Sequence, residues 1–341
     1  MNIDKHIIRK DSLEKLFDIL KQNNKIIFAP VSKNNKLSFR ETDDFSEIAT
    51  GYIQTAQSAK EMAFPRTEKL LDYSKSSEGI SVKGIDIESF PEIILWGVRP
   101  CDAMGIGQLG AIFNWDFKDE IYNSRLSRAT VFGFSCSKSD EYCFCTSVGG
   151  NPGNTTGSDI LFTKLGDDGD YLAEILTEKG SVVVTLASTL FEKAGDTKKE
   201  QFLADVPVTF DKEKIRKNLE KFFESEQWVE QSLKCLGCGA CAYVCPTCAC
   251  FDIQDESHGK SGLRVRCWDS CGFSLFTLHT SGHNPRGVQS ERWRQRIMHK
   301  FSYMPERLTV YGCTGCGRCS RACPADMNIL EHLISIQEAA L

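Results

Sequence analysis

Residues 235–246 read CLGCGACAYVCP, and residues 313–324 repeat the same cysteine spacing as CTGCGRCSRACP. Each stretch has the form C-x2-C-x2-C-x3-C and ends in proline. Four cysteine thiolates are the usual ligands of a [4Fe–4S] cluster, and the two-residue spacings let one tight loop supply three of them. The two stretches therefore predict two iron–sulfur clusters on one chain.

The ligands of the two clusters follow from the ferredoxin pattern, in which the fourth cysteine of each run ligates the cluster of the other run. On this rule the first centre takes Cys235, Cys238, Cys241 and Cys323, and the second takes Cys313, Cys316, Cys319 and Cys245. Zinc sites usually come as two separated pairs of ligands, and disulfides are rare in reducing compartments. Both alternatives are therefore disfavoured.

A third group of cysteines follows two predicted strands. Cys101 lies just beyond the apolar run 92–98, and Cys136 lies just beyond the run 130–134. Neighbouring parallel strands bring such residues to the crevice where α/β sheets bind ligands. The loop that follows completes the group with Cys143 and Cys145. We expect a third cluster here; the alternative is a set of buried apolar cysteines without metal.

The last four of the sixteen cysteines are Cys248, Cys250, Cys267 and Cys271. Their spacing, C-x-C with C-x3-C, matches no firm ligand template, so packing beside the clusters is favoured over a fourth metal centre such as zinc. The nearby basic segment carries Arg286, Arg292, Arg294, Arg296 and Lys300. It is interpreted as a solvated helix face, with charge compensation of the clusters or docking of an acidic partner as alternatives.

Composition limits the function classes. The 341 residues have a net charge of −5, which gives no reason to expect nucleic-acid binding. Mean hydropathy is −0.28 and no apolar run is long enough to span a membrane. The first twenty residues have the pattern of an amphipathic helix and not of an export signal. We therefore expect a cytoplasmic protein.

The predicted fold is α+β, with an α/β domain at residues 1–210, a helical connector at 211–233 and a mainly helical two-cluster domain at 234–341. The apolar runs expected to form strands are residues 25–31, 92–98, 130–134 and 181–186. Helices are expected at residues 172–178, 212–233, 291–301 and 329–340. Between the two cysteine runs, strand signals are weak, so residues 246–312 favour an alpha-helical ferredoxin-like module over a compact hairpin ferredoxin.

Seven motifs together resemble a known family. They are GVRPCDAMGI (97–106), CFCTSVGGNP (143–152), CGACAYVCPTCACFDI (238–253), RCWDSCGF (266–273), SGHNPR (281–286), RQRIMHKF (294–301) and CTGCGRCSRACP (313–324). The chain is similar over about residues 90–330 to the beta subunit of cytoplasmic sulfhydrogenases. It is also similar to the iron–sulfur subunit of anaerobic sulfite reductase and to homologous subunits found with flavin and heterodisulfide reductase modules.

The resemblance implies an electron-transfer subunit that connects a flavin subunit, which handles NAD(P)H, to a catalytic partner. That partner is expected to be of the hydrogenase or heterodisulfide reductase type, with a sulfite reductase as the alternative. The resemblance also implies the third cluster at Cys101, Cys136, Cys143 and Cys145. It leaves open the terminal acceptor, the direction of electron flow, and whether the complex bifurcates electrons.

Several sequence signatures of catalysis are missing from the chain. It has no flavin or dinucleotide fingerprint, so no flavin or NAD is expected on it. It also lacks the paired CCG signature of disulfide-cleaving subunits. We therefore expect an electron carrier without catalytic residues of its own. An enzyme with an open iron site and a scaffold with structural metals are the alternatives.

Overall fold

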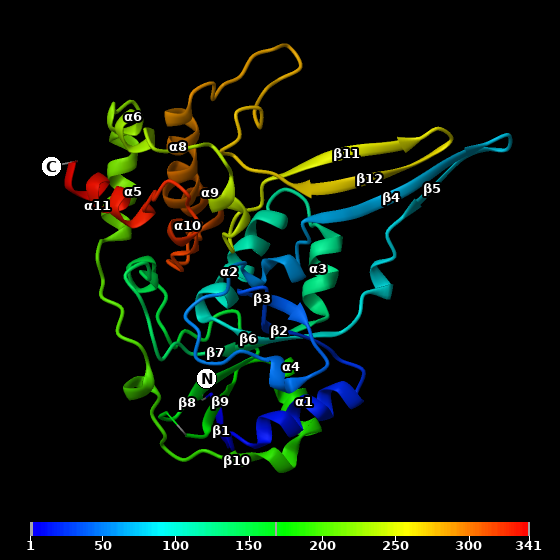
Figure 1. The fold of residues 1–341 in the computed structure, drawn as a ribbon, viewed down its shortest axis with the longest axis vertical. Coiled ribbons are helices and arrows are strands. Elements are labelled where there is room, and N and C mark those ends of the chain that lie inside the picture. Colours follow the sequence, from blue (N-terminus) through cyan, green and yellow to red (C-terminus); the bar gives the residue numbers. More distant parts are fainter. Residues whose placement is uncertain (1–2, 168, 340–341) are drawn as a thin grey trace.

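The computed structural model describes residues 3–167 and 169–339. A mixed eight-stranded sheet occupies the N-terminal part, in the strand order β10-β1-β9-β8-β7-β6-β2-β3 (Figure 1). Strands β2, β6, β7 and β8 run parallel, and the others pair antiparallel. The strands are β1 (Asp4–Ile8), β2 (Ile26–Lys33), β3 (Lys36–Glu41), β6 (Ile93–Val98), β7 (Ala129–Phe134), β8 (Ile160–Lys164), β9 (Tyr171–Ile175) and β10 (Phe191–Lys193).

Helices cover both faces of this sheet, which explains why its central strands are apolar throughout. All six residues of β6 are buried. Leu16 of α1 packs with Trp96 on one face, and Ile106 of α2 packs with Leu95 on the other. The helices of this part are α1 (Ser12–Gln22), α2 (Pro100–Phe113), α3 (Glu120–Ser127) and α4 (Glu178–Leu186). The predicted α/β sheet is therefore confirmed.

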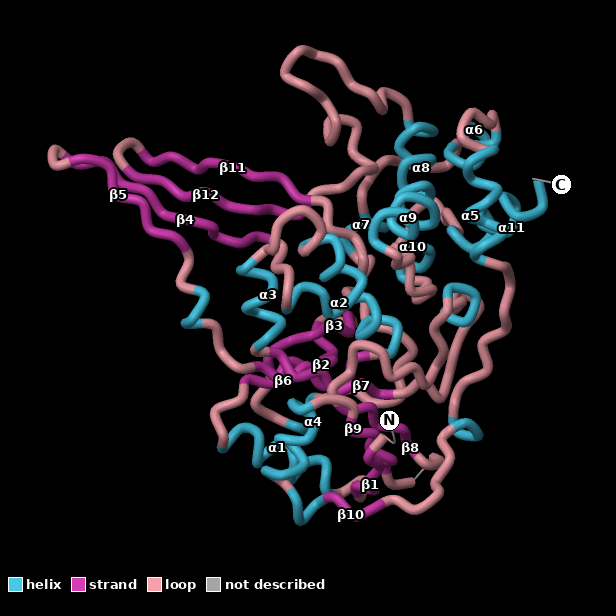
Figure 2. Tube along the Cα trace, turned by 180° about the vertical axis from the view of Figure 1, so that it is seen from behind, coloured by secondary structure: helices cyan, strands magenta, loops and turns pink. Residues whose placement is uncertain are grey.

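A second, four-stranded antiparallel sheet projects from the body as a long arm (Figures 1 and 2). Its strand order is β11-β12-β4-β5, formed by β4 (Thr67–Ser76), β5 (Gly79–Gly84), β11 (Phe251–His258) and β12 (Ser261–Trp268). The helical expectation for residues 246–312 is wrong over this hairpin. Every residue of β11 is exposed, and apolar residues alternate with polar ones only at Phe251 and Ile253, so its sequence carries a weak strand signal.

Mostly helical structure surrounds the cysteine runs. Its elements are α5 (Lys212–Lys221), α6 (Gln227–Ser232), α7 (Ala240–Tyr243), α8 (Gln289–Met298), a π-helical turn (His299–Tyr303), α9 (Met304–Leu308), α10 (Arg318–Arg321) and α11 (Ile329–Ala339). Leu219, Ile297 and Leu333 share its core. The remaining short turns are η1 (Phe45–Glu47), η2 (Ala59–Met62), η3 (Ile87–Ser89), η4 (Cys145–Val148), η5 (Ser188–Leu190) and η6 (Glu200–Phe202).

Most predicted elements are confirmed, and two are interchanged. Residues 181–186 were expected to form a strand, but they belong to the helix α4, whose N-cap residue is Thr177. Residues 172–178 were expected to be helical, but residues 172–175 belong to β9, whose residues are all buried inside the sheet, and only residue 178 is helical, as the start of α4. The sequence of α4 is rich in β-branched valine, yet Val182 is 66% exposed. The strand propensity of valine therefore gave the wrong prediction here, because strand pairing elsewhere in the sheet determined which segment became a strand.

The first twenty residues divide between β1 and α1, so only their second half is the expected amphipathic helix. Residue 340, the end of the predicted C-terminal helix, lies outside the described residues. The division at residues 210 and 234 stays a prediction. The arm sheet pairs β12, from beyond that division, with β4 from before it.

Candidate iron–sulfur centres

The two cysteine runs fold into the same backbone shape. In the first, Gly237 and Gly239 have φ of 65° and 73°, and in the second, Gly315 and Gly317 have φ of 66° and 69°. These left-handed conformations favour glycine, and each loop then enters a short helix, α7 or α10. The internal repeat seen in the sequence is thus a structural repeat, with successive cysteines placed around one side of a turn.

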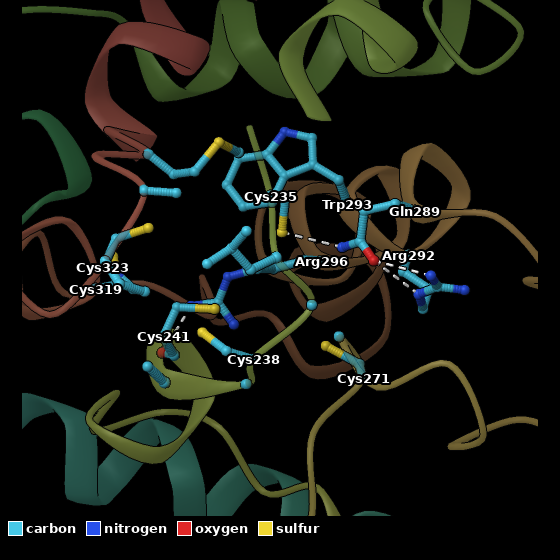
Figure 3. Close-up of a pocket in the computed structure, with 18 of the residues that line it drawn as sticks. Cys235, Cys238, Cys241, Cys271, Gln289, Arg292, Trp293, Arg296, Cys319 and Cys323 are labelled. Carbon is cyan, nitrogen blue, oxygen red and sulfur yellow. Dashed lines mark hydrogen bonds between the residues drawn. The ribbon is translucent and has the colours of Figure 1, made fainter. Parts of the chain in front are cut away.

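The cysteines predicted for the first centre line a pocket that gathers cysteines from both runs (Figure 3). Its predicted ligands all line this pocket: Cys235, Cys238, Cys241 and Cys323. Nε2 of Gln289 donates a hydrogen bond of 3.1 Å to Sγ of Cys235, and the side chain of Arg292 holds the amide oxygen of Gln289. Cys238 is exposed, so this pocket reaches the molecular surface.

The cysteines predicted for the second centre lie deeper. Cys245, Cys313 and Cys316 are buried, and burial raises the pKa of Cys313 to about 12, an effect that the charge of Lys300 opposes. The Nζ of Lys300 donates hydrogen bonds to Sγ of Cys245 at 3.4 Å and to the carbonyl of Gly312 at 2.6 Å. Burial lowers the pKa of Lys300. The negative charges of the Cys245 and Cys248 thiolates outweigh this effect and raise the pKa of Lys300 above its ordinary value.

The third group converges at the carboxyl ends of the parallel strands β6 and β7, as the sequence suggested. One pocket is lined by Cys101, Cys136, Cys143 and Cys145. Two polar side chains reach its sulfurs: Nε2 of Gln54 donates to Cys101 at 3.1 Å, and Nη2 of Arg321 donates to Cys143 at 3.4 Å. Four thiols that line one pocket, with hydrogen-bond donors to two of their sulfurs, fit an iron–sulfur cluster.

The loop of the second run borders both other groups. Cys319 lines the first pocket, and Cys316 lines the third. This loop packs closely against the segment Cys143–Cys145. A Cβ added to Gly315 would lie 2.5 Å from the backbone nitrogen of Cys145. The three groups of cysteines are therefore contiguous, with the second between the first and the third.

A buried ion pair fastens the same loop to the α/β part. The guanidinium of Arg318 binds both carboxylate oxygens of Asp102 at 2.5 Å, and it also donates to the carbonyl of Thr55 at 2.9 Å. Burial raises the pKa of Asp102, and the charge of Arg318 opposes that rise. Asp102 follows Cys101, and Arg318 precedes Cys319. The pair thus positions two cysteine groups relative to each other.

Three of the remaining four cysteines, Cys248, Cys250 and Cys271, lie close to one another or to a ligand predicted for the second centre. The thiols of Cys250 and Cys271 are hydrogen-bonded to each other, and Cys248 is hydrogen-bonded to Cys245. Cys271 lines the first pocket. Among residues 3–167 and 169–339, no three His, Cys, Asp or Glu side chains lie close enough together to hold a single metal ion.

The solvated-face interpretation of the basic helix is wrong for two of its residues. Arg296 and Lys300 are each only 4% exposed. Nη1 of Arg296 lies 3.5 Å from Sγ of Cys248, and Nη2 donates to the carbonyl of Cys241 at 3.0 Å. Both cations face cysteines, as the charge-compensation alternative required. Sequence reasoning missed Gln54 and Gln289 altogether, since nothing in their sequence context marks them.

The fold and these sites define an iron–sulfur protein built from a sheet-rich N-terminal part and a dicluster part. Residues 234–327 match the family model described as a 4Fe-4S dicluster domain, which implies two [4Fe–4S] clusters. Over 342 residues the chain is 28% identical to sulfhydrogenase 2 subunit beta of Pyrococcus furiosus, covering 98% of each chain. The chain is therefore similar to that beta subunit along nearly its whole length, with a 4Fe-4S dicluster domain in its C-terminal part. No solved structure matches the chain.

Proposed function

We propose that this chain relays electrons from a subunit that binds flavin and NAD(P)H to a catalytic partner of the hydrogenase or heterodisulfide reductase type, or in the reverse direction. Its similarity to a protein named as a sulfhydrogenase subunit supports a setting of several subunits. In the described residues, no helix is long and apolar enough to cross a membrane. The clusters, when bound, would supply single-electron transfer.

The ligand sets that we propose are those of the crossed ferredoxin pattern together with the third group. The first centre would be held by Cys235, Cys238, Cys241 and Cys323, the second by Cys313, Cys316, Cys319 and Cys245, and the third by Cys101, Cys136, Cys143 and Cys145. Support comes from the two pockets that collect the first and third sets, and from the burial of three cysteines of the second set, Cys245, Cys313 and Cys316.

One observation carries the proposal: the loop of the second run contributes to the surroundings of every centre. Cys319 reaches the first pocket and Cys316 the third, so centres held there would be neighbours in one row. The first pocket opens at Cys238 beside Leu236, which is 71% exposed. A row that begins at the surface and continues through the interior is the arrangement expected of a conduit.

The polar side chains of each site would adjust how readily its cluster accepts an electron. Hydrogen bonds to cluster sulfurs and nearby positive charge favour the reduced, more negative state. A neutral donor, Gln289, serves the first site, whereas Lys300 brings a buried positive charge to the second. Arg321 brings a charge to the third site. Potentials are therefore expected to differ along the row.

The test is to interrupt the row in the complex purified without oxygen. Cys238→Ser and Cys316→Ser are each expected to abolish NAD(P)H-driven reduction of the partner's substrate. Each partner's own half-reaction with an artificial dye should persist. Val208→Ser, at a loop position 71% exposed, is the control and should leave throughput unchanged. Full electron flow in either cysteine variant would refute the relay.

The composition of the purified complex tests the partners separately. Co-purification with a flavin protein and with a hydrogenase or heterodisulfide reductase subunit is the expected result. A sirohaem protein in their place would favour the alternative, the iron–sulfur subunit of an anaerobic sulfite reductase.

A further inference from the structure

We propose that Cys248, Cys250, Cys267 and Cys271 hold a fourth iron–sulfur cluster beside the dicluster pair. The inference does not depend on the relay function, because it concerns only what these four side chains bind. It rests on three features: the convergence of the four thiols, the buried cations that surround them, and their place against the other centres.

Convergence is produced by the β11–β12 hairpin. Cys250 immediately precedes β11, and the nitrogen of Asp269, just after β12, donates to its carbonyl at 2.9 Å. Cys267 pairs with Asp252 in the ladder. Because alternate strand residues share a face and opposed residues do too, Cys267 lies on the same face as Cys250. The hairpin thus brings together cysteines that are seventeen positions apart in the sequence.

The other two cysteines flank the open end of this hairpin, one before β11 and one after β12. Cys271 follows β12 by three residues, and its thiol is hydrogen-bonded to that of Cys250. Cys248 precedes Cys250 by two residues and is hydrogen-bonded to Cys245. Two segments of the chain, residues 248–250 and 267–271, therefore each bring two cysteines to the same region, as expected for the ligands of one metal centre.

Three buried cations surround this region. Lys60, Arg296 and Lys300 are 2%, 4% and 4% exposed. Nζ of Lys60 donates to the carbonyl of Cys248 at 3.0 Å, and Arg296 reaches its sulfur at 3.5 Å. Within the described part of the chain, none of the three forms an ion pair with Asp or Glu.

A buried positive charge without a counter-charge is strongly destabilising, so the three cations require negative charge nearby. The first two clusters would satisfy part of this requirement, since Lys300 also contacts Cys245 and Arg296 contacts the backbone of Cys241. Among the described residues, Lys60 contacts no cluster-motif sulfur. Its Nζ donates to the carbonyls of Ala242 and Cys248 and lies 4.0 Å from the centre of the Trp268 ring, so no anionic group in the described part of the chain balances its charge. A fourth thiolate-bound centre would supply the charge that Lys60 faces.

The donor set decides the kind of metal. Four thiolates select zinc or an iron–sulfur cluster over ions that prefer oxygen or imidazole. The position favours iron–sulfur, because Cys271 lines the first pocket and Cys248 contacts a ligand predicted for the second centre. A centre held there would lie beside two others and be able to exchange electrons with them.

The first measurement is the iron, acid-labile sulfide and zinc content of the full chain purified without oxygen. Four [4Fe–4S] clusters would give about sixteen iron per chain, and three would give about twelve. The double variant Cys250→Ala/Cys271→Ala is expected to lose about four iron and four sulfide per chain, because alanine offers no ligand atom. The electron paramagnetic resonance signals of the dicluster pair should remain, which shows that the variant has folded.

The matched control is Cys101→Ala/Cys136→Ala, which tests the third group by the same loss. If the wild-type chain holds about twelve iron and this control lowers it to about eight, the third group accounts for all iron beyond the pair and the fourth cluster is refuted. That comparison decides the matter even if the Cys250→Ala/Cys271→Ala variant does not fold. Zinc lost with Cys250 and Cys271 in place of iron, or a Cys250–Cys271 disulfide in the anaerobic protein, would also overturn the proposal.

Discussion

The Asp102–Arg318 ion pair allows a sharp test of how the two parts of the chain are joined. Its side chains are 1% and 2% exposed, and the guanidinium makes two hydrogen bonds of 2.5 Å to the carboxylate. Asp102→Asn keeps the shape of the side chain and removes its charge. The variant leaves Arg318 buried without a carboxylate partner, so that only neutral oxygens, those of Thr55 and of the new amide, accept its hydrogen bonds.

The magnitude follows from the burial of the pair. Removing one partner of a buried ion pair leaves an uncompensated charge and costs about 3–5 kcal/mol. Local opening should therefore become easier by a factor of about 10² to 10⁴, since 1.4 kcal/mol corresponds to a factor of ten. The opening would separate the N-terminus of α2, with Cys101, from the loop that carries Cys316 and Cys319.

Hydrogen exchange of the anaerobic protein, resolved by mass spectrometry, measures this opening directly. Faster exchange is expected in peptides that cover α2 and α10, with little change in α1. Asp116→Asn is the matched control, because Asp116 is exposed in the loop after α2. The double variant Asp102→Leu/Arg318→Met removes both charges and should recover most of the lost protection. Exchange in Asp102→Asn equal to that of the control would refute the reasoning.

Three further predictions concern single side chains. Lys300→Met should lower the reduction potential of the centre that includes Cys245, because it removes a buried positive charge 3.4 Å from that sulfur. A redox titration followed by electron paramagnetic resonance measures this potential, and an unchanged value would contradict the prediction. Gln289→Leu should alter the electron paramagnetic resonance signal of the first centre, and Gln54→Leu that of the third, since each variant removes a hydrogen-bond donor 3.1 Å from a sulfur. An effect of either variant on the signal of the other centre would count against the assignments. Gly315→Ala should reduce stability by at least about 2 kcal/mol, because its φ is 66° and a Cβ would meet Cys145 and Phe144 at 2.5 Å. Thermal melting checks the Gly315→Ala prediction against Gly107→Ala, where no atom lies within 4 Å of the added carbon.

Local features of this protein were predictable from its sequence. The two cysteine runs, with their glycines, predicted two matching ligand loops, because cluster ligation requires close spacing along the chain. The apolar runs at residues 92–98 and 130–134 predicted parallel strands that deliver Cys101 and Cys136 to one edge of the sheet. These predictions succeeded because spacing and strand direction are encoded within short segments.

Features that join distant segments were decided only by the tertiary structure. The arm sheet pairs β12 with β4, which lies almost two hundred positions earlier, and β11 is exposed throughout and has only a short alternating pattern at its start. The Asp102–Arg318 pair and the Gln54 and Gln289 donors likewise depend on contacts between remote segments. The valine-rich α4 and the buried β9 exchanged their expected states because pairing and burial outweigh local propensity. Sequence spacing thus determined which cysteines share a loop, and packing between remote segments determined which loops and donors share a site.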